Sequence, residues 1–322
     1  FTKHPKYAAG GSLPSEKSII FDEQSNELFI FDTTYSADSS ASPFSFFGGT
    51  QDTAFSVSFW IYIRDTPSTT ANIVGKTGAG GTKREWTVFL PSSGRRINIV
   101  LRDESTDGYI GKYTSDELSQ NAWNHVVTTY SGNETSAGCK IYVNGSAVTI
   151  TTTESGTYSG MDTSAGGHTG KIGSANLIAL LTDVSIWNIE LTAAEISGLY
   201  NSGTPTNLLK EPMCTKDSSN LVVWWRMGND VGDAIKSGGG SSAVAVDNII
   251  RDQTGNSRHA LPYTGMEGDE IVTTYHPKSS RPGNAADNPD ALSNPESTPL
   301  NLVNRGVPNL RKRNTAYKVT KS

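Results

Sequence analysis

The chain has 322 residues, a formal net charge of −5, 18% charged and 35% hydrophobic residues, and 32 glycines. This composition excludes a disordered chain and is typical of many short strands joined by tight turns. No stretch approaches the roughly 18 apolar residues of a membrane helix. The two cysteines, Cys139 and Cys214, are too few for a disulfide-stapled scaffold, although one bridge between them stays open.

A main domain over residues 15–265 is predicted to follow an N-terminal arm over residues 1–14. Runs of β-branched and aromatic residues, bounded by turn-forming residues, predict strands throughout this domain. The predicted strands are Ser18–Phe21, Glu27–Phe31, Phe55–Ile63, Asn72–Gly75, Trp86–Leu90, Ile97–Arg102, His125–Tyr130, Lys140–Val143, Ala147–Thr152, Thr182–Trp187 and Leu221–Met227. The pattern indicates an all-β protein.

The clearest strand is Phe55–Ile63, because its residues alternate strictly between two different faces. One face is wholly apolar, while the other carries Ser56, Ser58, Trp60 and Tyr62. Period-two alternation predicts that the apolar face packs on a second sheet. The aromatic outer face is then either covered or a binding surface.

A hairpin is predicted where Asn144-Gly145 separates Lys140–Val143 from Ala147–Thr152. Asn and Gly tolerate the positive φ angles that a tight antiparallel turn requires. The pair of strands should therefore be adjacent in one sheet.

One short helix is predicted at Leu191–Tyr200. Thr192 and Glu195 have the spacing of a capping box, and Leu191 can pack on Ile196 across the helix start. We expect this helix to lie against the rim of the sheets.

Residues 266–322 are polar and proline-rich and show little apolar periodicity, so they are predicted to form an extended C-terminal arm. A basic end of this kind either grips a neighbouring subunit or remains a solvated tail. The basic residues assigned to the assembly arm are Arg305, Arg311, Lys312, Arg313, Lys318 and Lys321.

Several phrases, taken together and in order, resemble the laminin-G-like branch of the concanavalin A-like lectin/glucanase superfamily, a relative of the pentraxins. They are Ser18–Asp22, Phe55–Ile63, Ile73–Lys76, Trp123–Tyr130, Lys140–Gly145, Lys171–Gly173 and Leu181–Leu191. The resemblance covers Ser18 to Tyr200 and implies a two-sheet antiparallel jelly roll.

The family's opening strand and its Asp-x-x-Gly-Asn turn resemble Leu221–Asn229 and Arg251–Ala260. In typical members this pair precedes the first matched strand, whereas here it comes near the end. We interpret it as a permuted strand or as the remnant of a second repeat.

Catalysis is not predicted. A glycoside hydrolase needs two carboxylates facing each other across the sugar. In this superfamily the usual strand motif for them is Glu-x-Asp-x-x-Glu. The nearest phrase, Glu267–Glu270, has no third acid at the spacing of that motif. No Gly-x-Ser-x-Gly elbow occurs, and the histidines are scattered. His125, within a strand phrase, is interpreted as structural.

Relatives in this family often bind calcium through loop carboxylates, so the resemblance leaves calcium binding open. No other cofactor is expected. Asp103, Asp107, Asp162 and Asp183 lie in or near predicted loops. Asp183 is the metal candidate, and a structural hydrogen bond is its alternative role.

Three tryptophans are candidates for stacking against sugar rings. The strand pattern makes three tryptophans the better candidates for exposure, namely Trp60, Trp86 and Trp224. The alternative for each is burial on a covered face, because alternation does not reveal what covers a sheet.

The expected function is a non-enzymatic structural subunit of a large assembly, namely a virion capsid-decoration or tail-associated protein. Its arms would bind neighbouring copies or other capsid and tail proteins, and its loops would contact surface glycans. Neither a membrane nor a nucleic-acid partner is expected. A secreted or cell-surface glycan-binding lectin is the alternative, with an extracellular location, and a glycoside hydrolase is the third hypothesis.

Overall fold

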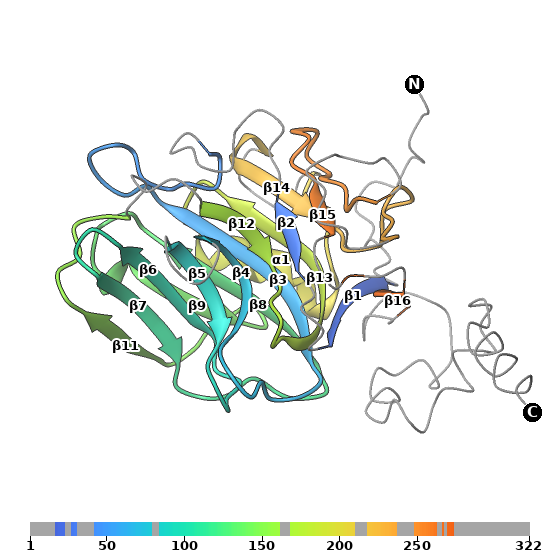
Figure 1. Ribbon diagram of the computed structural model, residues 1–322, viewed down its shortest axis with the longest axis horizontal. Coiled ribbons are helices and arrows are strands. Elements are labelled where there is room, and N and C mark those ends of the chain that lie inside the picture. The colour runs from blue at the N-terminus through green and yellow to red at the C-terminus, as the bar shows by residue number, and fades with distance from the viewer. Residues whose placement is uncertain are drawn as a thin grey trace, which may run out of the picture.

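The computed structural model describes the strands of the sandwich and part of the connections between them (Figure 1). The described residues are 17–22, 27–30, 42–78, 84–161, 168–209, 218–236, 248–262, 266 and 269–273. The predicted arm over residues 1–14 lies outside this part of the chain. So do all six basic residues assigned to the C-terminal arm.

Two antiparallel sheets form the body. Sheet A has eight strands in the order β10-β9-β8-β3-β13-β1-β16, with β14 also paired to β13. Its strands are β1 (Lys17–Asp22), β3 (Phe55–Ile63), β8 (Trp123–Tyr130), β9 (Cys139–Val143), β10 (Ser146–Ala147), β13 (Ile178–Trp187), β14 (Leu221–Trp225) and β16 (Ile271–Thr273).

Sheet B also has eight strands, in the order β11-β7-β6-β5-β4-β12-β2-β15. They are β2 (Leu28–Ile30), β4 (Ala71–Gly78), β5 (Arg84–Leu90), β6 (Asn98–Asp103), β7 (Gly108–Thr114), β11 (Ile150–Ser155), β12 (His168–Ile172) and β15 (Ala260–Pro262). The two antiparallel sheets confirm the predicted all-β sandwich.

The core between the sheets follows from the alternation seen in β3. Phe55, Val57, Phe59 and the two isoleucines of that strand all lie in the main core and are fully buried. Burial of this apolar layer against the facing strands of sheet B is the main stabilising term of the fold. Trp60 and Tyr62 point to the outer side, where they belong to a separate buried cluster.

The predicted hairpin forms, but its second strand is shorter than expected. Asn144 and Gly145 both have positive φ, and Ser146 pairs with Val143. The predicted strand Ala147–Thr152 is wrong as a single element, because β10 ends at Ala147 and β11 pairs with β7 in the other sheet. The chain thus passes from sheet A to sheet B at this point.

The helix α1 (Ala193–Tyr200) begins where the capping box predicts. The Thr192 side chain accepts a hydrogen bond from the Glu195 amide, and the Glu195 carboxylate accepts one from the Thr192 amide. Leu191 and Ile196 are buried in the same cluster on the outer side of sheet A. Three short 3₁₀ turns are also described: η2 (Ser136–Gly138), η3 (Asn201–Gly203) and η4 (Ser218–Asn220).

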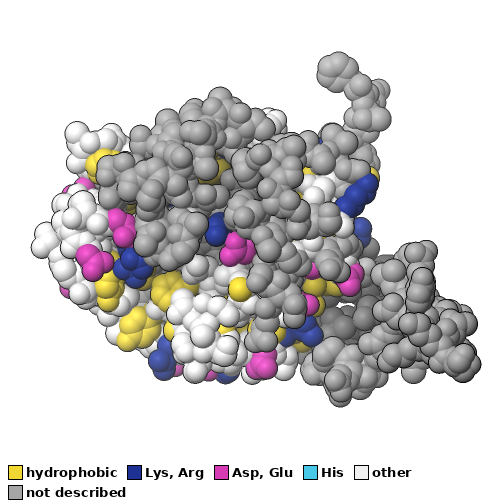
Figure 2. All heavy atoms as spheres, viewed as in Figure 1, with side chains coloured by type: hydrophobic (Ala, Val, Ile, Leu, Met, Phe, Trp, Pro, Cys, Tyr) yellow, Lys and Arg dark blue, Asp and Glu magenta, His cyan; other side chains and the backbone are white. Residues whose placement is uncertain are grey.

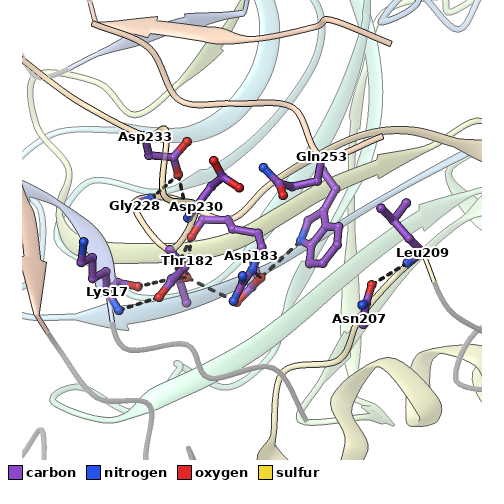
Figure 3. Close-up of polar contacts among 12 residues, drawn as sticks. Lys17, Thr182, Asp183, Asn207, Leu209, Gly228, Asp230, Asp233 and Gln253 are labelled. Carbon is purple, nitrogen blue, oxygen red and sulfur yellow. Dashed lines mark hydrogen bonds and ion pairs between the residues drawn. The ribbon is translucent and has the colours of Figure 1, made fainter. Parts of the chain in front are cut away.

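The strands β14 and β1 lie end to end along the same edge of β13. Trp225 of β14 pairs with Val184, and Ile19 of β1 pairs with Leu181, both antiparallel to β13. The joint is held by Asn229, whose amide nitrogen donates to the Lys17 carbonyl at 2.6 Å and whose oxygen accepts from the Lys17 amide at 2.8 Å (Figure 3). The two strands therefore act as one interrupted strand, which agrees with the permuted-strand interpretation.

The sandwich extends beyond the boundary predicted at residue 265. Met266 is buried in the main core, and β16 pairs with β1 in the register Lys17–Thr273. Met266 and β16 thus belong to the domain rather than to an arm. In the described part of the chain, no helix has the length and apolar character needed to span a membrane.

Candidate functional site

The sequence candidates Asp183, Trp60 and Trp224 come together on the outer face of sheet A. All three line one small pocket together with Ser58, His125 and Thr206. The fourth candidate, Trp86, does not line this pocket but lies in the main core between the sheets. Its ring packs on Phe46 and Phe55, and its indole nitrogen donates to the Phe44 carbonyl at 2.8 Å.

The three tryptophans are not exposed platforms for sugars. Trp60, Trp86 and Trp224 have only 3%, 1% and 2% of their surface exposed. The Trp60 ring packs at a tilt against His125 and stacks with Tyr200 of α1, while Trp224 packs in a cluster with Leu199 and Leu208. The proposed stacking role is therefore wrong for each of them, because the face that each ring occupies is already covered.

Asp183 occupies an irregular point in β13 where the pairing with β3 shifts between Thr182 and Ser185. Its φ of 47° is in the left-handed region. Its carboxylate accepts a hydrogen bond from the Trp224 indole at 3.2 Å and lies 3.8 Å from the Arg226 guanidinium (Figure 3). The charge is thus compensated by a buried cation, which favours the structural role over calcium binding.

The other acidic calcium candidates are Asp103, Asp107 and Asp162. Burial alone would raise the pKa of Asp103, but hydrogen bonds from Ser105 and Ser159 hold that pKa below its usual value. These bonds fasten two loops together. Asp107 is exposed, and Asp162 lies outside the described residues. Across the residues that the structure describes, no three His, Cys, Asp or Glu side chains are grouped as a metal site.

The pocket contains a serine–histidine pair that the sequence did not predict. Ser58 Oγ lies 3.0 Å from His125 Nε2, and both residues are buried. A nucleophilic triad also requires a carboxylate that orients the histidine, yet His125 Nδ1 has no hydrogen-bond partner. Burial lowers the pKa of His125 to about 3. The Ser58–His125 hydrogen bond is therefore a structural contact of a neutral histidine.

Among the described residues, no cysteine forms a reactive centre. Cys139 is a free, buried thiol whose pKa burial raises to about 12. Such a thiol is a poor nucleophile, because the reactive form is the thiolate. Cys214, the other half of the bridge left open by the sequence, lies outside the described residues.

Partly exposed aromatic residues lie instead on the outer side of sheet B. Ile99, Leu101 and Ile110 face the core, so the alternate residues of β6 and β7 face outward. On β7 these are Tyr109, Gly111 and Tyr113. Both tyrosines are half-buried, unlike the fully buried tryptophans of sheet A. Figure 2 shows hydrophobic, uncharged, basic and acidic side chains over the side of the molecule where β6, β7 and β11 lie.

The strand β11 extends the same face to the edge of the sheet. Thr151 pairs with Tyr113, Thr153 with Gly111 and Ser155 with Tyr109. Next to Tyr109, the Arg102 guanidinium lies 4.9 Å from the centre of the tyrosine ring. We call this set, Arg102, Tyr109, Gly111, Tyr113, Thr151 and Thr153, the tyrosine face.

Sequence reasoning missed the tyrosine face because it missed β7. The two glycines and the lysine of Gly108–Thr114 interrupt the apolar run that predicts a strand. A detectable signal was present nonetheless: Tyr109, Gly111 and Tyr113 alternate with Ile110 and Lys112. Gly111 is required structurally, since a Cβ there would lie 2.2 Å from the Ile99 carbonyl oxygen.

Many solved structures resemble this chain at low sequence identity. A protein described as a "putative carbohydrate binding protein" from Bacteroides ovatus has 16% identity and a TM-score of 0.48, over 78% of this chain and 58% of that one. The heptameric SAP-like pentraxin of Limulus polyphemus has 15% identity and a TM-score of 0.36, over 58% and 82%. Botulinum neurotoxin type C, whose cell entry depends on two ganglioside molecules, has 21% identity and a TM-score of 0.34, over 47% and 36%.

This chain thus spans less than two thirds of the length of the Bacteroides ovatus protein. No curated protein sequence matches it. The family model of the concanavalin A-like lectin/glucanases superfamily, in its laminin-G form, matches residues 33–197, about half of the chain. The match includes β3, the hairpin and most of α1, which carried the resemblance in the sequence. The chain is therefore a laminin-G-like member of the concanavalin A-like lectin/glucanase superfamily.

Proposed function

We propose that this domain is a non-enzymatic carbohydrate-binding module that holds sugars on the tyrosine face. The observation that carries the proposal is the outward Tyr109–Gly111–Tyr113 series, with Arg102 over the Tyr109 ring. Aromatic rings stack on the apolar faces of sugars, while hydroxyl and guanidinium groups supply hydrogen bonds to sugar oxygens.

The spacing on β7 suits an extended ligand. Two residues that are four positions apart on a strand are separated by roughly 13 Å. Gly111 has no side chain, so the surface between Tyr109 and Tyr113 is low. Thr151 and Thr153 border it on one side. A short oligosaccharide can therefore lie along β7 with one sugar ring near each tyrosine.

The same face supports binding rather than hydrolysis. The outward positions of β6, β7 and β11 carry no Asp or Glu, counting Asn98, Val100 and Arg102 on β6 with the tyrosine face. Glycoside hydrolysis needs two carboxylates on opposite sides of the scissile bond. A ligand on these strands would meet aromatic, hydroxyl and guanidinium groups but not that pair of acids.

The test is a glycan array with the full chain, followed by titration calorimetry with an oligosaccharide that binds. Tyr113→Ala should lower the affinity roughly fivefold, because one aromatic stacking contact contributes about 1 kcal/mol. Thr151→Ala should also weaken binding. Thr152→Ala is the matched control, since this exposed neighbour on β11 faces the other way. Equal effects of Thr151→Ala and Thr152→Ala, or no binding to any glycan, would contradict the proposal.

We further propose that the module is displayed by a large assembly such as a virion, as a capsid-decoration or tail-associated subunit. Support comes from the basic composition of residues 305–321 and from the pairing of Lys17 with Thr273. That pairing places Lys17 and Thr273, the first and last described residues, side by side at one edge of the sandwich, while β11 lies at the opposite side (Figure 1). Anchoring at one edge would leave the tyrosine face free.

Deleting residues 283–322 tests this second proposal. The truncated chain should keep a folded sandwich, measured by circular dichroism and thermal unfolding, but should no longer co-purify with the particles. Replacing the six basic arm residues by Gln is the matched variant that keeps the length. Incorporation at the normal level by both variants would reject the arms as the anchor.

A further inference from the structure

The segment over residues 204–208 crosses the outer face of sheet A directly after α1 and η3. Pro205, Thr206 and Leu208 are buried, and Leu208 packs with Leu199 and Trp224. The same segment lines one side of the small pocket that also contains His125 and Asp183. Its position therefore decides whether Trp60 and Trp224 are covered.

Two buried polar atoms of this pocket have no partner. His125 Nδ1 and Thr206 Oγ1 make no hydrogen bond within the protein, although their residues are only 2% and 5% exposed. The other polar side chains of the pocket are satisfied: Ser58 by His125 Nε2, Asp183 by the Trp224 indole, and Ser185 by the Trp187 indole. An unmade hydrogen bond at a buried site is costly, so two of them in one pocket indicate a missing partner.

The size of the pocket defines what that partner is. Its free volume is about 10 Å³, which matches the space that a single water molecule occupies. A sugar, a buffer anion or a side chain of another molecule is too large. Water also fits either tautomer of the histidine, because it can both donate and accept a hydrogen bond.

We propose that this pocket is a binding site for one internal water molecule, which bridges His125 on sheet A to Thr206 on the covering segment. The bridge fastens residues 204–208 to sheet A through Thr206. It gives the segment a polar attachment in addition to its apolar one, and it keeps the aromatic outer face of sheet A closed.

The first test is a crystal structure of the full chain at high resolution. We expect one ordered water molecule within hydrogen-bond distance of both His125 Nδ1 and Thr206 Oγ1. A dry pocket, or a direct bond between the two side chains, would overturn the proposal.

The second test uses a pair of Thr→Val variants that differ in one respect. Thr128 is also fully buried with an unpaired hydroxyl, but it does not line the pocket. Thr206→Val should lower the Tm by about 2–4 °C, since it removes a hydrogen bond to a bound water. Thr128→Val should leave the Tm unchanged or raise it, since it removes an unsatisfied group.

Hydrogen exchange separates the bridge from a general loss of stability. In Thr206→Val the amides of residues 204–208 should exchange faster, while amides in β3 and β8 keep their protection. If Thr206→Val raises the Tm as Thr128→Val does, the hydroxyl has no partner in the native state and the water site is refuted.

Discussion

The outer faces of the two sheets carry similar chemistry but differ in cover. Sheet A presents Trp60 and Trp224 outward, yet α1 and residues 204–208 bury them. Sheet B presents Tyr109 and Tyr113 outward, and both remain half-buried. Aromatic residues on an outer face thus stabilise the fold where a segment covers them, whereas the two tyrosines of sheet B keep part of their surface exposed. The position of a residue on a strand does not separate these two roles.

The largest expected effect tests the covered face. Trp224→Ala should destabilise the protein by about 3–5 kcal/mol, because it removes a large buried side chain and leaves a cavity. The substitution also removes the indole donor to Asp183. Urea unfolding measures the loss. A loss below about 1 kcal/mol would mean that the cover on sheet A is loose.

A second prediction concerns the pH dependence of the covered face. Burial holds the pKa of His125 at about 3, whereas an unfolded histidine titrates near its usual value of 6.5. Between these values the unfolded state binds more protons, so stability falls as the pH falls. The slope should be up to about 1.4 kcal/mol per pH unit below pH 6.5.

His125→Gln should flatten that slope, measured as the difference in unfolding free energy between the two proteins from pH 7 to pH 5. Asp233 gives the opposite sign, because burial raises its pKa to about 6. Its contribution is lost as the pH rises from about 4 to 6, so Asp233→Asn serves as the control. An identical pH profile for wild type and His125→Gln would contradict the burial of a neutral histidine.

A third prediction concerns the backbone beneath the tyrosine face. Gly111→Ala should cost about 1–3 kcal/mol, because the new Cβ would approach the Ile99 carbonyl and force β6 and β7 apart. Gly94→Ala is the control, since its nearest neighbour is a proline side-chain atom at 3.2 Å. If both variants unfold at the same urea concentration, the close approach of β6 and β7 is not a constraint on this face.

Sequence reasoning identified the elements whose information is local. The alternation of β3, the capping box of Thr192 and the Asn144-Gly145 turn each depend on residues a few positions apart, and all three are present in the structure. The family resemblance added the order of the elements. It also identified Leu221–Asn229 as an opening strand, which lies end to end with β1.

The candidate site could not be predicted in the same way, because cover is a long-range property. Trp60 is buried by Tyr200, and Trp224 is buried by Leu208, which are distant from them in sequence. Periodicity shows which residues share a face but contains no information about what crosses that face. The strand β7 was not predicted for a different reason. Gly111 is required by the close approach of the β6 backbone, although glycine has a low strand propensity.

The smallest effect on stability is expected on the open face. Tyr113→Ala should cost less than about 1 kcal/mol, because a half-buried residue on an open strand surface loses little apolar contact. The same change should clearly weaken oligosaccharide binding. Tyr113→Ala therefore lowers affinity more than stability, whereas Trp224→Ala mainly lowers stability. Tyr113→Phe separates the ring from its hydroxyl and should keep most of the affinity if stacking dominates. If Tyr113→Ala instead destabilises the protein as strongly as Trp224→Ala, the ring is part of the packed structure and the two outer faces are equivalent.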